Sequence, residues 1–100
     1  MSTSQFIPLD PPGQILLEEF IEPLSLTQKA VAEACGIPYV RFSELVLGKR
    51  RVSAETDIRL GIYFGTSAGY WLRLQADYDL RKTEQERGKE IRKEVKGRAA

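Results

Sequence analysis

The sequence contains no histidine and only one cysteine, Cys35. Ser–His and Cys–His catalytic pairs and histidine metal sites are therefore excluded, and a lone cysteine forms neither an internal disulfide nor a Cys-x-x-Cys zinc site. A glycine-rich phosphate loop is also absent. We expect a protein that is not an enzyme and that uses no metal and no other cofactor. Because Cys35 lies on an apolar helix face, we interpret it as a small core residue rather than a reactive thiol.

Long apolar segments are missing as well. No run approaches the ~18 consecutive apolar residues of a membrane-spanning helix. The first ten residues, MSTSQFIPLD, contain no lysine, no arginine and no long apolar run, so they do not resemble a secretory signal. These absences predict a cytoplasmic protein without membrane association. An apolar content of 42% in 100 residues is enough for the core of one small domain.

Residues 27–51, TQKAVAEACGIPYVRFSELVLGKRR, predict a helix-turn-helix, whose second helix lies in the DNA major groove. Thr27 suits an N-cap, Gly36 suits the turn because glycine adopts a positive φ at little cost, and Pro38 can open the second helix. The alternative is a plain antiparallel helix pair. The expected buried residues are Val31, Ala34 and Cys35 in the first helix and Phe42, Leu45 and Val46 in the second, with Ala32 where the helices cross.

The second helix of this motif would present its outward side to DNA. Arg41 is the side chain there that can bind guanine bidentately, and Val40 can contact a thymine methyl group. Glu44 can accept a hydrogen bond from cytosine or can instead pair with Arg41. We expect the basic residues after the helix to contact phosphates, and a merely solvated loop is the alternative. The expected DNA-binding residues are Gln28, Tyr39, Val40, Arg41, Ser43, Glu44, Lys49, Arg50 and Arg51.

Three further helices complete the prediction of an all-α, five-helix fold. The first starts at residues 10–12 and ends or bends at Pro23, the fourth runs from an N-cap at Ser53 to Gly65, and a fifth follows Thr66 or Ser67. Gly61 in the middle of the fourth helix suggests that a neighbour packs closely against it. The expected inward-facing residues are Ile15, Leu16, Phe20 and Leu24 in the first helix, Ile58, Gly61 and Ile62 in the fourth, and Trp71, Leu74 and Tyr78 in the fifth.

Charge is distributed unevenly, although the formal net charge is only +1. Residues 1–24 carry −4, residues 25–51 carry +3, residues 52–80 carry −2 and residues 81–100 carry +4. The first positive block coincides with the helix-turn-helix, and nucleic-acid binding requires such a local positive surface. The predicted organisation is a helix-turn-helix domain over residues 1–81 and a charged C-terminal tail, helical or disordered, over residues 82–100.

Four segments together resemble a known family. They are the helix-turn-helix itself, PPGQILLEEFIEPLSLTQ, GKRRVSAET and YFGTSAGYWLRLQADYDLR. These segments are similar to the HigA/VapI antitoxins, which belong to the lambda-repressor-like helix-turn-helix class, and the likeness covers Pro12 to about Arg81. The resemblance implies a type II antitoxin that dimerises, represses its own operon by binding an operator palindrome, and neutralises a small RelE-like (HigB-type) RNA-cleaving toxin.

The chain departs from the pattern of this family in three places. Tyr39 and Val40 stand where a polar or basic residue is usual, and Leu47 stands where an asparagine is common. In the fourth helix, Gly61 and Ile62 replace an alanine followed by a basic residue. Two alternatives to the antitoxin and autorepressor therefore stay open. One is a protein-interaction module of the same fold with weak or lost DNA binding, and the other is a stand-alone transcriptional regulator.

Two protein partners are expected. One helix-turn-helix reads half of a palindrome, and the aromatic segment after Gly65 carries more apolar surface than one small domain covers, so we expect a homodimer. For those aromatic residues, packing is favoured over an RNA-stacking platform because no basic groove accompanies them. A toxin that binds RNA is basic, which favours docking on the acidic first helix, with the charged tail or a merely solvated helix as the alternatives. The expected dimer contacts are Trp71, Leu72, Leu74 and Tyr78, and the expected toxin contacts are Glu18, Glu19 and Glu22.

Overall fold

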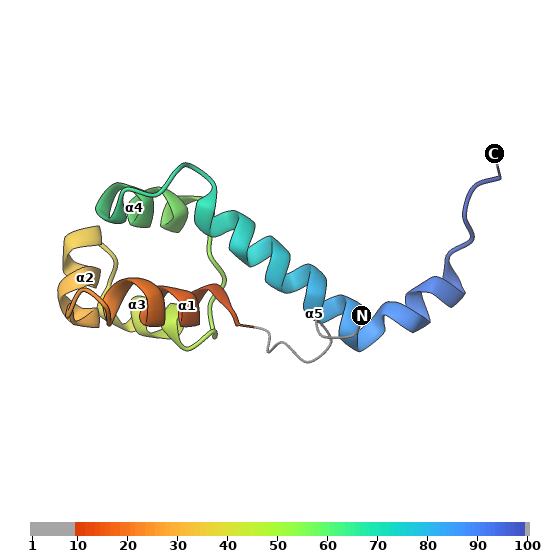
Figure 1. Cartoon of the computed structure of the whole chain (residues 1–100), viewed down its shortest axis with the longest axis horizontal. Coiled ribbons are helices and arrows are strands. Elements are labelled where there is room, and N and C mark those ends of the chain that lie inside the picture. Colours follow the sequence, from red (N-terminus) through yellow and green to blue (C-terminus); the bar gives the residue numbers. More distant parts are fainter. Residues whose placement is uncertain (1–9, 100) are drawn as a thin grey trace.

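The computed structural model describes residues 10–99, and every regular element within that range is a helix. The five-helix, all-α prediction is confirmed. Figure 1 shows the shorter helices gathered at one end of the molecule and the last helix leading away from them, along a longest axis of 52 Å. The elements are α1 (Pro12–Ile15), which continues directly as the π-helical segment η2 (Leu16–Ile21), then α2 (Gln28–Cys35), α3 (Tyr39–Val46), α4 (Ala54–Phe64) and α5 (Tyr70–Glu94).

The first helix changes from α to π geometry after its first turn. The N–H of Glu22 donates to the carbonyl of Leu17, five residues earlier, at 2.9 Å. Because a π turn brings residues five apart onto one face, Leu16 and Ile21 are both buried. The expected stripe, which assumed α-helical spacing, is therefore wrong at Leu24. That side chain lies beyond the end of the helix and is exposed.

Two glycines mark places where the chain approaches itself closely. A Cβ built on Gly13 would lie 2.8 Å from the Cα of Val46, and closer still to the carbonyl oxygen of Leu45. The first helix therefore touches the backbone at the end of α3, where no side chain fits. A Cβ on Gly61 would lie 3.2 Å from the carbonyl oxygen of Thr66. This contact confirms the close neighbour that the sequence predicts for Gly61.

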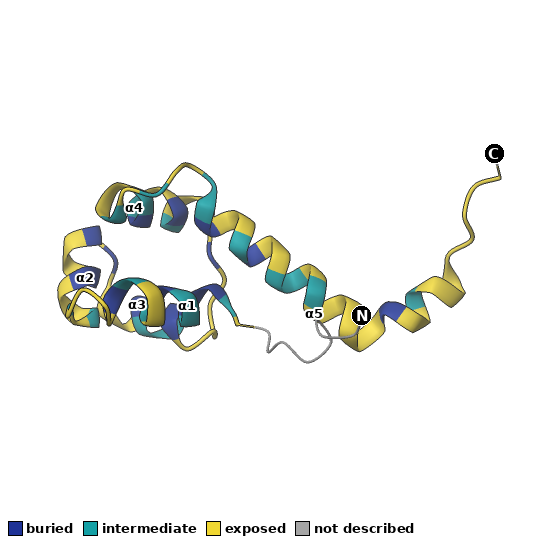
Figure 2. Cartoon of the chain, viewed as in Figure 1, coloured by how far each residue is buried: buried dark blue, intermediate teal, exposed yellow. Residues whose placement is uncertain are grey.

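The core lies between the short helices and the first turns of α5, as the dark residues in Figure 2 show. Trp71 is 0% exposed and packs against the ring of Phe20, with the ring centroids 4.9 Å apart, and against that of Tyr70, at 5.1 Å. The indole N–H of Trp71 donates to Thr66 Oγ1 at 3.0 Å, so the one polar group of this side chain is satisfied. Within the helix-turn-helix, the predicted burial of Val31, Ala32, Cys35, Phe42, Leu45 and Val46 is confirmed.

The inner face of α4 differs from the predicted one. Ile58 and Ile62 are exposed, Ile62 to 79%, whereas Asp57 and Leu60 are buried. The predicted inner face, which was built on the two isoleucines and Gly61, is therefore wrong at both isoleucines. A smaller error concerns α2, where Ala34 is exposed rather than buried.

Asp57 is buried because it caps the next helix. Helix α5 starts after Gly69, which has a φ of +85° and supplies no capping side chain. The carboxylate of Asp57 accepts hydrogen bonds instead from the backbone N–H groups of Gly69 at 2.8 Å, Trp71 at 2.8 Å and Leu72 at 3.2 Å. The amides at a helix start need acceptors, and a negative charge there is stabilised by the helix dipole. Asp57 thereby fixes α5 against α4.

Helix α5 continues without a break to Glu94, so most of the predicted tail, residues 82–94, takes the helical alternative. Its outer part is mostly exposed (Figure 2), with Gly88 buried and Ile91 half-buried, and it carries ion pairs such as Arg87–Glu90 at 3.3 Å. Exposed pairs of this kind contribute about 0–1 kcal/mol each. Within residues 10–99, no helix combines the length and the apolar character needed to cross a membrane.

Candidate nucleic-acid interface

Helices α2 and α3 form the predicted helix-turn-helix. The N-cap role of Thr27 is confirmed, since its Oγ1 accepts from the backbone N–H of Ala30 at 3.1 Å. Gly36 has a φ of +70° and ends α2 in the left-handed conformation that glycine adopts without strain. Pro38 is the N-cap of α3 rather than its first residue, one position earlier than expected. The three-residue connection, residues 36–38, sets α3 across α2.

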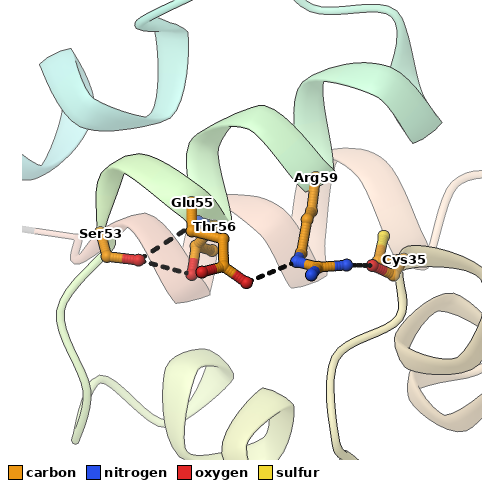
Figure 3. Close-up of polar contacts among 5 residues, drawn as sticks. All are labelled: Cys35, Ser53, Glu55, Thr56 and Arg59. Carbon is orange, nitrogen blue, oxygen red and sulfur yellow. Dashed lines mark hydrogen bonds and ion pairs between the residues drawn. The ribbon is translucent and has the colours of Figure 1, made fainter.

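Arg59 on α4 joins this motif to the rest of the domain (Figure 3). Its Nη1 donates to the carbonyl oxygen of Cys35, the last residue of α2, at 3.0 Å, and its Nε donates to Glu55 Oε2 at 2.9 Å. The carbonyls at a helix end lack partners within the helix, so a cation there is favourable. Ser53 caps the same α4 by accepting from the backbone N–H of Thr56 at 3.2 Å, as predicted.

Cys35, whose carbonyl accepts this hydrogen bond, is itself a buried residue. It is only 6% exposed, which confirms its interpretation as a core residue. Burial raises the pKa of the thiol above its ordinary value, and the nearby positive charge of Arg59 opposes this effect in part. The thiol is therefore protonated at neutral pH and a poor nucleophile.

The outward side of α3 is exposed as the sequence predicts. Phe42 points into the core at 0% exposure, while Tyr39, Val40 and Arg41 lie on the surface, Val40 at 71%. Leu47, just after the helix, is exposed too. A face that offers one cation among three apolar side chains can make few hydrogen bonds to base edges, so direct reading of sequence would depend on Arg41 and on shape.

Glu44 pairs with an arginine other than the one considered from the sequence. Its Oε1 accepts from Nε of Arg50 at 3.1 Å and from Nη2 of Arg50 at 2.8 Å. No ion pair among the described residues includes Arg41. The side chains of Arg50 and Glu44 are 50% and 39% exposed, so DNA can reach either one. Of the remaining expected DNA contacts, Lys49 is exposed, while Ser43 and Gln28 are partly buried.

Four arginines converge on a cleft of about 150 Å³ beside α3. Arg41 comes from α3, Arg50 and Arg51 from the loop after it, and Arg59 from α4. The first turn of α4 completes the wall and brings the positive end of a helix dipole, together with the carboxylate of Glu55 that pairs with Arg59. Guanidinium groups bind phosphate bidentately, and this cleft suits one phosphate group of a DNA backbone. Three of its arginines were predicted DNA contacts, but Arg59 was missed because nothing in the sequence places α4 against the end of α2.

The predicted dimer contacts on α5 need one correction. Trp71 is fully buried inside the domain, so it has no surface left for a partner. Leu74 and Tyr78 are also partly buried, and Leu72 is 37% exposed. The apolar stripe that suggested a dimer is thus largely covered by the helices of the same chain. The predicted toxin contacts Glu18, Glu19 and Glu22 are all exposed on or just after η2.

Comparison with known proteins supports the family suggested by the sequence. Virulence-associated protein I of Dichelobacter nodosus is 41% identical over 76 residues, which cover 76% of this chain and 70% of that protein. The antitoxin HigA of Pseudomonas aeruginosa, solved with the higBA promoter, superposes with a TM-score of 0.86 at 34% identity over 92% of this chain and 100% of that chain.

The antitoxin GraA, solved in complex with its operator, has the same TM-score of 0.86 and the same 34% identity, over 94% of this chain and 95% of that chain. No protein-family model matches the sequence. The likeness to the solved antitoxins nevertheless includes the helix-turn-helix, α4 and most of α5. The chain is therefore a member of the HigA/VapI family of helix-turn-helix antitoxins.

Proposed function

We propose that this protein is a DNA-binding autorepressor and the antitoxin of a type II toxin–antitoxin module. The observation that carries the DNA-binding part is the convergence of Arg41, Arg50, Arg51 and Arg59 on one cleft beside the exposed side of α3. The operator and promoter complexes of the related antitoxins support this function.

In the proposed complex, α3 enters the major groove and the cleft takes a backbone phosphate. Phosphate contacts fix the position of the protein on the duplex but carry no sequence information. Arg41 lines the cleft and also lies on the outward side of α3, so it is the residue placed to contact a base edge as well. Val40 would add an apolar contact to a thymine methyl group. Gln28 and Lys49 complete the proposed phosphate-contacting set, and Ser43 can contact either a base or a phosphate. Glu44 lies on the base-reading side, with Tyr39 at its edge.

A homodimer and a toxin complex belong to the same proposal. Two copies are needed to read a palindrome, and Leu72, with the exposed parts of Leu74 and Tyr78, is the surface of α5 left for a second copy. Light scattering at micromolar concentration tests this part, and an 11 kDa monomer under those conditions contradicts it. The proposed toxin partner is a basic RelE-like nuclease. It would dock on the acidic surface formed by Glu18, Glu19 and Glu22, whose charge is opposite to its own.

A protein-interaction module without operator affinity is the second candidate function. The observation that favours it is the exposure of Tyr39, Val40 and Leu47, three apolar side chains on the side of α3 that would have to meet DNA. Such a surface also suits a protein partner.

Salt-titrated binding to DNA separates the two candidates. The duplex from immediately upstream of the chain's own gene is compared with an unrelated duplex of equal length, by fluorescence anisotropy between 50 and 300 mM salt (roughly the range over which phosphate contacts weaken). As a control, Arg87→Ala removes an exposed arginine on the far part of α5, away from the arginine cleft. This variant should bind both duplexes as the wild-type chain does. Tighter binding to the upstream duplex supports the autorepressor. Equal and weak binding to both duplexes favours the interaction module.

A further inference from the structure

Two residues of α5 hold the loop that follows the helix-turn-helix. Gln75 is buried, and its Oε1 accepts from the backbone N–H of Val52 at 2.9 Å. The Nε2 of the same side chain donates to Asp79 Oδ1 at 3.1 Å. The other oxygen of that carboxylate, Oδ2, accepts from Nη1 of Arg51. A continuous set of hydrogen bonds therefore runs from the backbone N–H of Val52, through Gln75 and Asp79 on α5, to the guanidinium of Arg51.

The spacing of four residues explains why Gln75 and Asp79 act together. Residues four apart lie one above the other on a helix face, and both side chains here face the loop. The amide of Gln75 is held at both of its ends, so it fixes the direction of the Asp79 carboxylate. Both residues belong to the segment LQADYD, which is part of the family resemblance. Neither of the two has a role in the DNA, dimer or toxin contacts described above.

Arg51 is accessible while it is paired. Its side chain is 69% exposed, whereas that of Asp79 is 34% exposed. A phosphate approaching from solvent therefore meets the guanidinium before it meets the carboxylate. Arg51 also lines the arginine cleft, so the cation that pairs with Asp79 borders the candidate phosphate site as well.

We propose that Asp79 is an intramolecular counter-ion that competes with DNA phosphate for Arg51, and that Gln75 is the residue that positions it. The inference rests on the proposed DNA-binding function. A phosphate bound by Arg51 brings a second negative charge next to Asp79, and that repulsion lowers the affinity for DNA of any sequence. Base contacts made from α3 are unaffected. The carboxylate thus reduces the sequence-independent part of binding.

This role requires that the fold does not depend on the Arg51–Asp79 pair. An exposed ion pair contributes little to folding, and Asn at position 79 can still accept the hydrogen bond from Gln75. The test compares Asp79→Asn with Asp77→Asn on the upstream duplex and on an unrelated duplex. Asp77 is a matched control, because it lies on the same helix, makes one exposed ion pair with Arg81 and loses the same charge. Circular dichroism melting accompanies each variant.

We expect Asp79→Asn to bind both duplexes about two- to fivefold more tightly per bound protomer than Asp77→Asn does, since exposed ion pairs have strengths of that order. The slope of log K for DNA binding against log salt concentration should steepen by up to about one ion per protomer. The reason is that the phosphate then no longer competes with the Asp79 carboxylate for Arg51. In an Arg51→Ala background the gain should vanish, which a merely structural role of Asp79 would not produce. Asp79→Glu, which keeps the charge, should bind like the wild-type chain.

Several outcomes overturn the inference. Equal affinities of Asp79→Asn and Asp77→Asn contradict it, as does a gain that persists without Arg51. An Asp79→Asn chain that fails to fold contradicts it too, because Asp79 would then be a structural residue. These results differ from a failure of the proposed function. If the wild-type chain binds neither duplex, the DNA-binding proposal fails and the inference fails with it.

Discussion

The carboxylate of Asp57 accepts a 2.8 Å hydrogen bond from the backbone N–H of Trp71, and this contact joins the two longest helices at the centre of the core. It replaces the N-cap that Gly69 cannot provide, and it places the indole of Trp71 against the first helix. The position of α5, and with it the position of Gln75 and Asp79, therefore depends on one buried acid.

Replacing Asp57 by alanine should lower the free energy of unfolding by about 2–4 kcal/mol, because several backbone N–H groups would lose their acceptor in a buried place. Urea unfolding monitored by circular dichroism measures the change. Asp77→Ala removes an exposed carboxylate and should change the stability by less than about 0.5 kcal/mol. Equal effects of the two substitutions would show that Asp57 is not the cap we describe.

Replacing Gly13 by alanine should destabilise the domain by about 1–3 kcal/mol, the usual cost of overpacking. The new methyl group would overlap the backbone of α3 at Leu45 and Val46, and backbone cannot move aside as a side chain can. Gly97→Ala is the matched control, since a Cβ there meets nothing within 4 Å. A Gly13→Ala protein as stable as the wild type would contradict the packing of α1 on α3.

Arg41→Ala and Arg51→Ala should separate base contacts from phosphate contacts. Loss of Arg41 should cost about 1–3 kcal/mol per half-site on the cognate operator. The loss on unrelated DNA should be smaller, because only the contribution of Arg41 to the phosphate cleft is removed there. Loss of Arg51 should weaken both duplexes alike and reduce the salt slope by about one per protomer. Competition binding at several salt concentrations measures both effects. An unchanged specificity ratio in Arg41→Ala would remove its proposed base-reading role.

Alkaline pH should destabilise the domain in part through Cys35. Its pKa is raised in the folded state by burial, so the unfolded chain loses the thiol proton first. The contribution of this group to stability is fully present below the unfolded pKa, about 8.5, and is lost as the pH rises through the folded pKa. Urea unfolding between pH 7 and 10 should show a steeper loss for the wild type than for Cys35→Ala. Parallel curves would mean that the thiol titrates as freely in the folded chain as in the unfolded one.

Charge reversal of Glu18, Glu19 and Glu22 together should slow association with a basic toxin and flatten the salt dependence of that rate, because electrostatic attraction chiefly sets the association rate. DNA binding should be unchanged, since these residues lie on the first helix and not around the arginine cleft. Stopped-flow association measures the toxin reaction. If the triple variant behaves like the wild type and deletion of residues 82–100 abolishes binding, the tail is the docking site.

The sequence by itself determined the features that depend on neighbouring residues along the chain. The caps at Thr27 and Ser53, the left-handed turn at Gly36 and the buried face of α3 all follow from local rules, because capping, turn geometry and helical spacing act within a few residues. The same local signals located the exposed cations of the candidate DNA-binding surface. Helical spacing alone failed in three places. In the first helix a π turn moved the buried position to Ile21, in α4 the side that faces the core was assigned wrongly, and in α2 Ala34 is exposed.

Tertiary structure decided which polar side chains turn inward and which cations meet. Asp57 is buried because it accepts hydrogen bonds from the start of α5, where Gly69 provides no capping side chain. No local sequence pattern predicts that the start of α5 lies against α4. Arg59 reaches the end of α2, and Asp79 reaches Arg51, across 24 and 28 residues of sequence. Such pairings depend on how helices pack against one another. For that reason the sequence indicated the DNA-facing helix, whereas only the folded chain assembled the arginine cleft and its internal counter-ion.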